Sequence, residues 1–144
     1  MTTIIAILLF IIFLFLSGIH IYWALGGGWG KDAAIPTKDN NVKVMNPSVL
    51  STLIVAFGLL GFGLVVVLNV VEVDFKPSFW LDFIYKYGLW IITGIFFLRA
   101  IGDFNYLGFF KKYKLTNFGR NDTKYFSPLC LLIGILTIIV ELSK

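Results

Sequence analysis

The chain carries few side chains that could do chemistry near neutral pH, and they lie near the ends of long apolar runs. His20 is its one histidine, the residue type best suited to act as a general acid or base at neutral pH. Arg99 and Asp103 are four residues apart, so on a helix they share a face and can form an ion pair. Asp122 and Ser127 lie near the start of the last apolar run. Together these side chains could line a polar pocket.

Helical spacing adds Trp23 to this group. Ser17, His20 and Trp23 follow one another at intervals of three residues, which places them on one stripe of a helix. Ionisable groups within a membrane span usually face the interior of a bundle or a wet cavity. We therefore predict a candidate ligand pocket at one membrane face, formed by His20, Trp23, Arg99, Asp103, Asp122 and Ser127.

The same residues also fit purely structural roles, and the sequence leaves both interpretations open. Arg99 and Asp103 could clamp two helices together. His20 could donate a hydrogen bond to a neighbouring helix, as polar residues do in membrane bundles. Trp23 could be an interfacial anchor. Ser127 could cap a helix whose first position is the proline that follows it.

Composition places the chain in a membrane and excludes several kinds of site. Of its 144 residues, 58% are hydrophobic and only 14% are charged, whereas soluble domains carry about 25% charged residues. The single cysteine, Cys130, cannot form an internal disulfide, which excludes a dithiol oxidoreductase unless a partner supplies the second thiol. The single histidine excludes bis-histidine haem and three-histidine zinc sites. We expect no cofactor and no metal.

Four apolar runs must position these side chains. They predict an all-α, polytopic four-transmembrane-helix bundle in a single domain, residues 1–144, with spans at about 4–25, 48–71, 79–101 and 124–142. Each approaches or exceeds the ~20 residues needed to cross a bilayer. The fourth is short, and a helix starting nearer Asp122 and bent at Pro128 would fit the bilayer better.

The distribution of basic residues predicts the orientation. With four spans, the first and third connections share one side, and nine of the 12 lysines and arginines lie in them or at the adjacent helix ends: Lys31, Lys38, Lys43, Arg99, Lys111, Lys112, Lys114, Arg120 and Lys124. Basic residues favour the cytoplasmic side. We predict a multi-pass protein of the bacterial inner membrane with connections 26–46 and 102–124 in the cytoplasm and both termini outside.

The third connection mixes aromatic residues with lysines over residues 102–114. This pattern is typical of a segment that lies in the headgroup region against anionic lipid. Stacking on nucleic acid would use similar residues, but the hydrophobicity of the chain argues against it. The expected partners are membrane lipid, a small amphipathic ligand or other membrane subunits, and no nucleic acid.

Three stretches resemble a known family. They read HIYWALGGGWG at residues 20–30, FLRAIGDFNY at 97–106 and SPLC at 127–130. Together they resemble a bacterial family of small four-span membrane proteins defined as a domain of unknown function, number 3995. The resemblance implies four spans and no particular activity. One position departs from the pattern, which has a tyrosine directly before the serine where this chain has Phe126.

Three functions fit these features. The first is an accessory or binding protein with a polar pocket at the cytoplasmic face for a lipid-like or small amphipathic ligand. The second is a membrane-embedded enzyme in which His20 is the general acid or base, Asp103 or Asp122 orients it and Arg99 holds an anion. The third is a structural subunit of a membrane complex. A coupled transporter is disfavoured because, apart from His20, ionisable residues avoid the middle of the spans.

Overall fold

A computed structural model describes residues 1–39, 42–71 and 78–144, which contain four long helical segments. The first three are α1 (Thr2–Ala24), α3 (Val49–Leu68) and α4 (Phe79–Ile101). The last runs without a break through α5 (Asn117–Asn121), the π-helical turn η2 (Asp122–Phe126) and α6 (Ser127–Ser143). All four segments are long and apolar enough to cross a membrane, which confirms the predicted four-helix architecture.

The outer surface of the bundle is apolar as well as its core. Ile4, Leu50 and Leu98 are each about 70% exposed although they lie within the spans. Helices that are apolar all round belong in lipid, because water would leave such surfaces uncovered. The chain is therefore a multi-pass membrane protein.

The bundle consists of two antiparallel helix pairs, α1 with α3 and α4 with α6. One buried hydroxyl bond joins the members of each pair. Ser17 Oγ donates to the carbonyl oxygen of Ala56 at 2.8 Å, and the Thr93 and Thr137 hydroxyls lie 2.8 Å apart. Such bonds satisfy polar groups that lipid cannot. Ser17 thus links two helices and does not belong to a ligand pocket.

The two pairs meet in an apolar core. Phe13 of α1 packs edge-on against Phe62 of α3 and Phe96 of α4, with ring centroids 6.0 and 5.6 Å apart. Phe62 and Phe96 also contact each other at 6.2 Å. Edge-to-face aromatic packing of this kind favours a fixed arrangement of the helices that contribute the rings.

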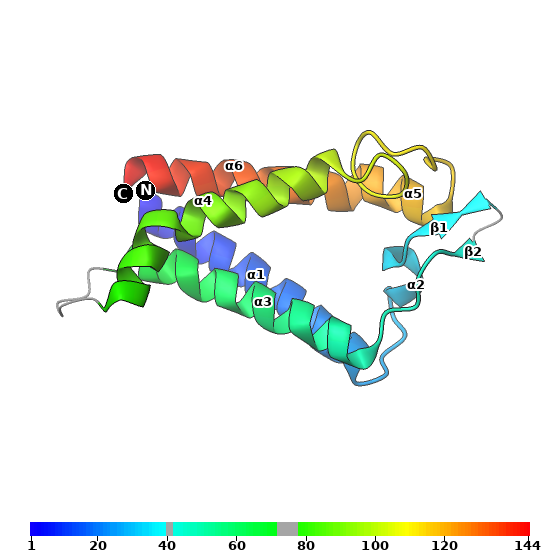
Figure 1. The fold of residues 1–144 in the computed structure, drawn as a ribbon, viewed down its shortest axis with the longest axis horizontal. Helices are drawn as coiled ribbons and strands as arrows, with labels where there is room; N and C mark the ends of the chain where they lie inside the picture. Colours follow the sequence, from blue (N-terminus) through cyan, green and yellow to red (C-terminus); the bar gives the residue numbers. More distant parts are fainter. Residues whose placement is uncertain (40–41, 72–77) are drawn as a thin grey trace.

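Figure 1 shows that the pairs converge at the end that holds both termini and separate toward the other end. We call these the terminal end and the connection end. At the connection end lie α2 (Lys31–Ala34) and a hairpin of β1 (Thr37–Lys38) and β2 (Val42–Lys43), in which Thr37 pairs with Lys43. The salt bridge from Lys43 to Asp32, 2.6 Å long, ties the hairpin to α2.

The last helical segment begins earlier than the predicted start near residue 124. Thr116 caps it by accepting a hydrogen bond from the backbone N–H of Gly119 at 2.9 Å. Pro128 has no N–H, so the pattern of backbone hydrogen bonds along the helix must change around it. It changes through η2, in which the N–H of Ser127 bonds to the carbonyl oxygen of Asp122. The predicted capping role of Ser127 is therefore wrong, because the helix is already formed there.

Candidate functional site

A buried ionic cluster occupies the connection end, centred on the carboxylate of Asp122. This side chain is 0% exposed. Its Oδ1 accepts from Nη2 of Arg99 at 2.8 Å. Its Oδ2 accepts from the backbone N–H of Gly108 at 2.8 Å, from Nζ of Lys111 at 3.0 Å and from the hydroxyl of Ser127 at 3.1 Å. We call Arg99, Lys111, Asp122 and Ser127 the Asp122 cluster.

Lys111 is a structural member of this cluster. It is 1% exposed, and Nζ donates to three acceptors: the carbonyl oxygen of Gly108 at 2.7 Å, Asp122 Oδ2 at 3.0 Å and Thr123 Oγ1 at 2.6 Å. An ammonium group has three N–H donors, so all of them are satisfied. Residues 102–114 were expected to lie in the headgroup region against anionic lipid, and Lys111 departs from that expectation because its side chain is buried in the protein.

A tight loop delivers Lys111 to the cluster. Gly102 and Gly108 close it with φ angles of 90° and 84°, and a Cβ on Gly108 would lie 2.5 Å from the Cα of Gly102. Only glycine tolerates both the left-handed backbone and that approach. Asp103 lies inside this loop, where Oδ1 accepts from the backbone N–H groups of residues 105, 106 and 107 at 2.7–3.0 Å.

The predicted pairing of Arg99 with Asp103 does not form, because each has other partners. Burial raises the pKa of the Asp103 carboxyl, but the backbone hydrogen bonds outweigh that effect and lower it below the ordinary value of 3.8. Arg99 turns instead to Asp122 on the last helical segment. The spacing of four residues is compatible with pairing of Arg99 to Asp103 and also with pairing to Asp122. The loop amides determine the outcome, because they occupy the carboxylate of Asp103.

Next to the cluster, the separation of the helix pairs leaves a cavity of about 670 Å³. All four spans line it, and at the connection end Ala33 and Ala34 of α2 and the preceding Gly30 also line it. Most of its walls are apolar, with residues such as Leu59, Phe62 and Ile133. The polar lining residues are His20 and Arg99, together with Trp23, Trp29 and Cys130.

His20 has a defined orientation in the cavity wall. Its Nδ1 lies 2.7 Å from the carbonyl oxygen of Leu16, and its ring packs edge-on against Trp23 with centroids 5.1 Å apart. A carbonyl oxygen only accepts, so Nδ1 carries the proton and the neutral ring keeps its lone pair on Nε2. Trp23 in turn donates its indole N–H to the carbonyl oxygen of Trp29 at 2.8 Å.

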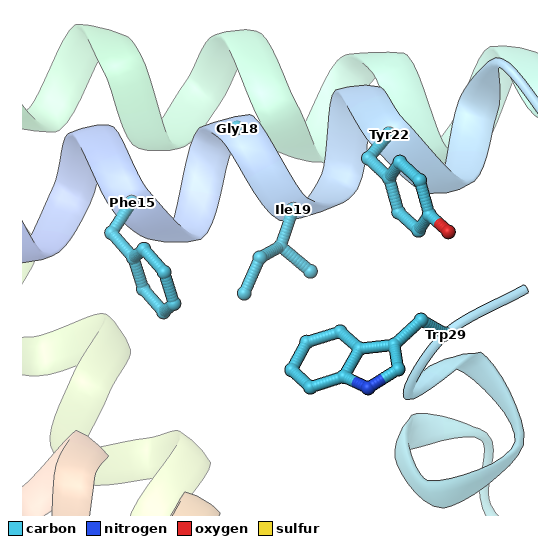
Figure 2. Close-up of a pocket in the computed structure, with 5 residues that line it drawn as sticks. All are labelled: Phe15, Gly18, Ile19, Tyr22 and Trp29. Carbon is cyan, nitrogen blue, oxygen red and sulfur yellow. The ribbon is translucent and has the colours of Figure 1, made fainter. Parts of the chain in front are cut away.

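A groove on the outer face of α1 adjoins the cavity. It has a volume of about 410 Å³ and is lined by Phe15, Gly18, Ile19, Tyr22 and Trp29. Figure 2 shows the indole of Trp29 lying across from Ile19 and Tyr22, with the space between them open. Phe15, Ile19 and Trp29 line the cavity as well. The groove and the cavity therefore share a wall formed by α1 and Trp29.

Comparison with protein families matches residues 13–137 to the family described as "Protein of unknown function (DUF3995)". The chain belongs to the DUF3995 family. This confirms the resemblance predicted from the three stretches, all of which lie within the matched range. No curated protein and no solved structure matches the chain.

In this DUF3995 protein the predicted pocket residues divide into three groups. His20, Trp23 and Arg99 line the cavity. Asp122 and Ser127 lie behind it in the buried cluster, linked to the cavity through Arg99. Asp103 is exposed and serves the loop. Phe126 lines the cavity and makes that part of the wall apolar.

Sequence reasoning missed Lys111 and α2. Lys111 stands in a run of three lysines within four residues, and no local signal separates it from its exposed neighbour Lys112. The glycine pair at 102 and 108 was the available clue, because two glycines flanking a short loop can indicate a close backbone approach. The cavity depends on how the helix pairs separate, and helix periodicity carries no information on that.

Proposed function

We propose that this protein is an integral membrane binding protein, which holds a small amphipathic, lipid-like molecule in the cavity between its two helix pairs. The observation that carries the proposal is the combination of apolar walls with two ionisable side chains at the connection end, His20 and Arg99. A volume of about 670 Å³ lies within the range of about 300–1,000 Å³ that is usual for ligand sites. Apolar walls with a few polar groups match the two parts of an amphipathic molecule.

The outer groove supports a ligand that comes from the bilayer. Phe15, Ile19 and Trp29 border both spaces, so a chain lying in the groove would already contact the residues that line the cavity. The groove is open to the surroundings of the bundle, because Phe15 and Trp29, which line it, are 64% and 74% exposed. A molecule dissolved in the membrane could reach the cavity through this side without crossing the connections.

A membrane-embedded enzyme acting through His20 is the second candidate. One observation favours it: the bond to Leu16 fixes the tautomer and leaves Nε2 as a base. However, the carboxylates of Asp103 and Asp122, which were expected to orient the imidazole, bond elsewhere. A backbone carbonyl holds the ring instead. Binding is for this reason the function that the geometry supports best.

The proposed orientation places the connection end in the cytoplasm of a bacterial inner membrane and both termini outside, as the positive-inside rule favours. In a Cys130→Ser background, an impermeant maleimide applied to intact cells should label Ser143→Cys and leave Lys114→Cys unlabelled until the cells are opened. Both sites are exposed at opposite ends of the bundle. The reverse labelling pattern would invert the orientation.

Tryptophan fluorescence can test binding directly. Of the four tryptophans, Trp23 and Trp29 line the cavity. Replacing Trp80 and Trp90 by phenylalanine leaves these two as reporters. A long-chain alcohol with bromine atoms on its chain, titrated into the protein in neutral detergent, should quench them saturably, since bromine quenches only at close range.

Two glycines of α3 provide a matched pair of variants. Gly58 lines the cavity, and a Cβ there meets no atom within 4 Å, so Gly58→Phe should fill part of the space without a clash. Gly61 is equally free around its Cβ but does not line the cavity. Gly58→Phe should weaken saturable quenching at least about tenfold, equivalent to about 1.4 kcal/mol, while Gly61→Phe should not. Equal binding by both variants would refute the proposal.

A further inference from the structure

The charges next to the cavity do not balance. The Asp122 cluster contains two cations, Arg99 and Lys111, and one carboxylate. Within residues 1–39, 42–71 and 78–144, Asp122 is the only carboxylate that contacts either cation. One positive charge is therefore left over in a partly buried setting, where an uncompensated charge is unfavourable.

The surplus charge faces the cavity through Arg99. Its Nη2 is bonded to Asp122, whereas its Nη1 is buried and has no hydrogen-bond partner among the described residues. Lys111 differs, because all three of its N–H donors are used. Arg99 lines the cavity and Lys111 does not. The guanidinium thus offers N–H donors and an unbalanced charge to whatever occupies the cavity.

Building on the proposed function, we propose that the occupant is a single-chain amphiphile with an anionic head group, which accepts hydrogen bonds from the guanidinium of Arg99, whose side chain is 29% exposed. Its apolar chain lies against Leu59, Phe62 and Ile133 between the helix pairs. The shared chemistry is an anionic oxygen group, a carboxylate or a phosphate monoester. Arginine binds both types, because its planar N–H groups match their oxygens.

Other head groups fit less well. A cationic head would add to the positive charge of the cluster, and like charges repel strongly where water is scarce. A neutral hydroxyl could accept a hydrogen bond from the guanidinium of Arg99 but would leave the charge uncompensated. A single negative charge equals the surplus, so a carboxylate is the simplest match.

Head-group selectivity in the unaltered cavity tests this. Four brominated probes with the same chain are compared in the two-tryptophan background: an alcohol, a carboxylate, a phosphate monoester and a trimethylammonium compound. Titrations are done in neutral detergent at a pH where the carboxylate is ionised. The carboxylate should bind at least about tenfold more tightly than the alcohol, and the trimethylammonium probe most weakly. Tighter binding of the phosphate than of the carboxylate would assign the head group to the phosphate class.

Arg99→Gln keeps the two N–H donors of an amide but removes the charge. It should reduce the carboxylate-to-alcohol preference to about onefold while alcohol binding persists. If Arg99→Gln does not fold, the comparison of the four probes in the protein with Arg99 intact still tests the proposal. If the protein with Arg99 intact binds the alcohol and the carboxylate equally, and Gly58→Phe weakens both, the proposal of an anionic head group is overturned. The proposed function as a binding protein then still stands. Insensitivity of every probe to Gly58→Phe would instead overturn the proposed function.

Discussion

The two ends of the bundle are held in different ways. At the terminal end, polar contacts cross between the helix pairs: Lys144 donates to Oδ1 of Asn69 at 2.9 Å, and the hydroxyl of Tyr85 donates to the carbonyl oxygen of Val71 at 3.0 Å. At the connection end, the bonds of the Asp122 cluster all lie within α4, the last helical segment and the loop between them. Polar contacts therefore join the pairs at the terminal end, and the Asp122 cluster stiffens one pair at the connection end.

This difference explains where the cavity lies. The aromatic contacts of Phe13 with Phe62 and Phe96 bring the pairs together in the core, and the bond from Lys144 to Asn69 joins them beyond it. Past Phe96 toward the connections, the pairs separate, and α2 lies between them in contact with α5. The Asp122 cluster makes its bonds within the pair of α4 and α6. The pair of α1 and α3 forms the opposite wall of the cavity.

The largest expected effect is the loss of the Asp122 carboxylate. Asp122→Ala would leave the buried Lys111 and the partly buried Arg99 without their counter-ion. Breaking a buried ionic network in this way costs about 3–5 kcal/mol. We expect a large loss of unfolding free energy, measured by denaturant titration in mixed micelles.

The control for this variant is the ion pair at the terminal end. Glu141 bonds to Lys144 at 2.7 Å, but Lys144 keeps its other acceptors when Glu141 is changed. Glu141→Gln should therefore cost less than about 1 kcal/mol. Equal losses for the two variants would show that the ends are held alike and would break the comparison.

Hydrophobic patterning was enough to predict the fold. The apolar runs predicted four spans, and three of them, α1, α3 and α4, begin within two residues of their predicted starts. The fourth begins earlier because polar residues 117–126 continue the helix, capped by Thr116 and widened before Pro128. Hydropathy detects the lipid-crossing part of a helix and not its polar extension.

The site was only partly predictable. His20, Trp23 and Arg99 were expected in a pocket and do line the cavity. The partner of Arg99 was not predictable, because an aspartate four residues away competes with one 23 residues away. The choice depends on the loop closed by Gly102 and Gly108, whose amides occupy Asp103. Burial of Lys111 follows from that loop too, so both errors have one physical cause.

An intermediate effect is expected at Lys111. Lys111→Met removes three hydrogen bonds but leaves Asp122 neutralised by Arg99. The loss should be about 1–3 kcal/mol, smaller than for Asp122→Ala. Lys112→Met, at an exposed neighbouring position, should change the unfolding free energy by less than about 0.5 kcal/mol. If the two methionine variants behave alike, Lys111 does not stabilise the cluster.

The smallest effect concerns Asp103 and sharpens the contrast between the buried and exposed carboxylates of the connection end. Its pKa is lower in the folded protein than the ordinary value of 3.8, because loop amides donate to its ionised form. A lowered pKa means that this contribution to stability is present above the ordinary pKa and is lost as the pH falls through the folded value.

Asp103→Asn should therefore be less stable than the parent protein at neutral pH. The difference should shrink progressively as the pH is lowered to 3.8 and below. Unfolding titrations of both proteins across this acidic range measure it. A difference that does not depend on pH would mean that the amide oxygen replaces the carboxylate fully, so that charge has no part in holding the loop that carries Lys111.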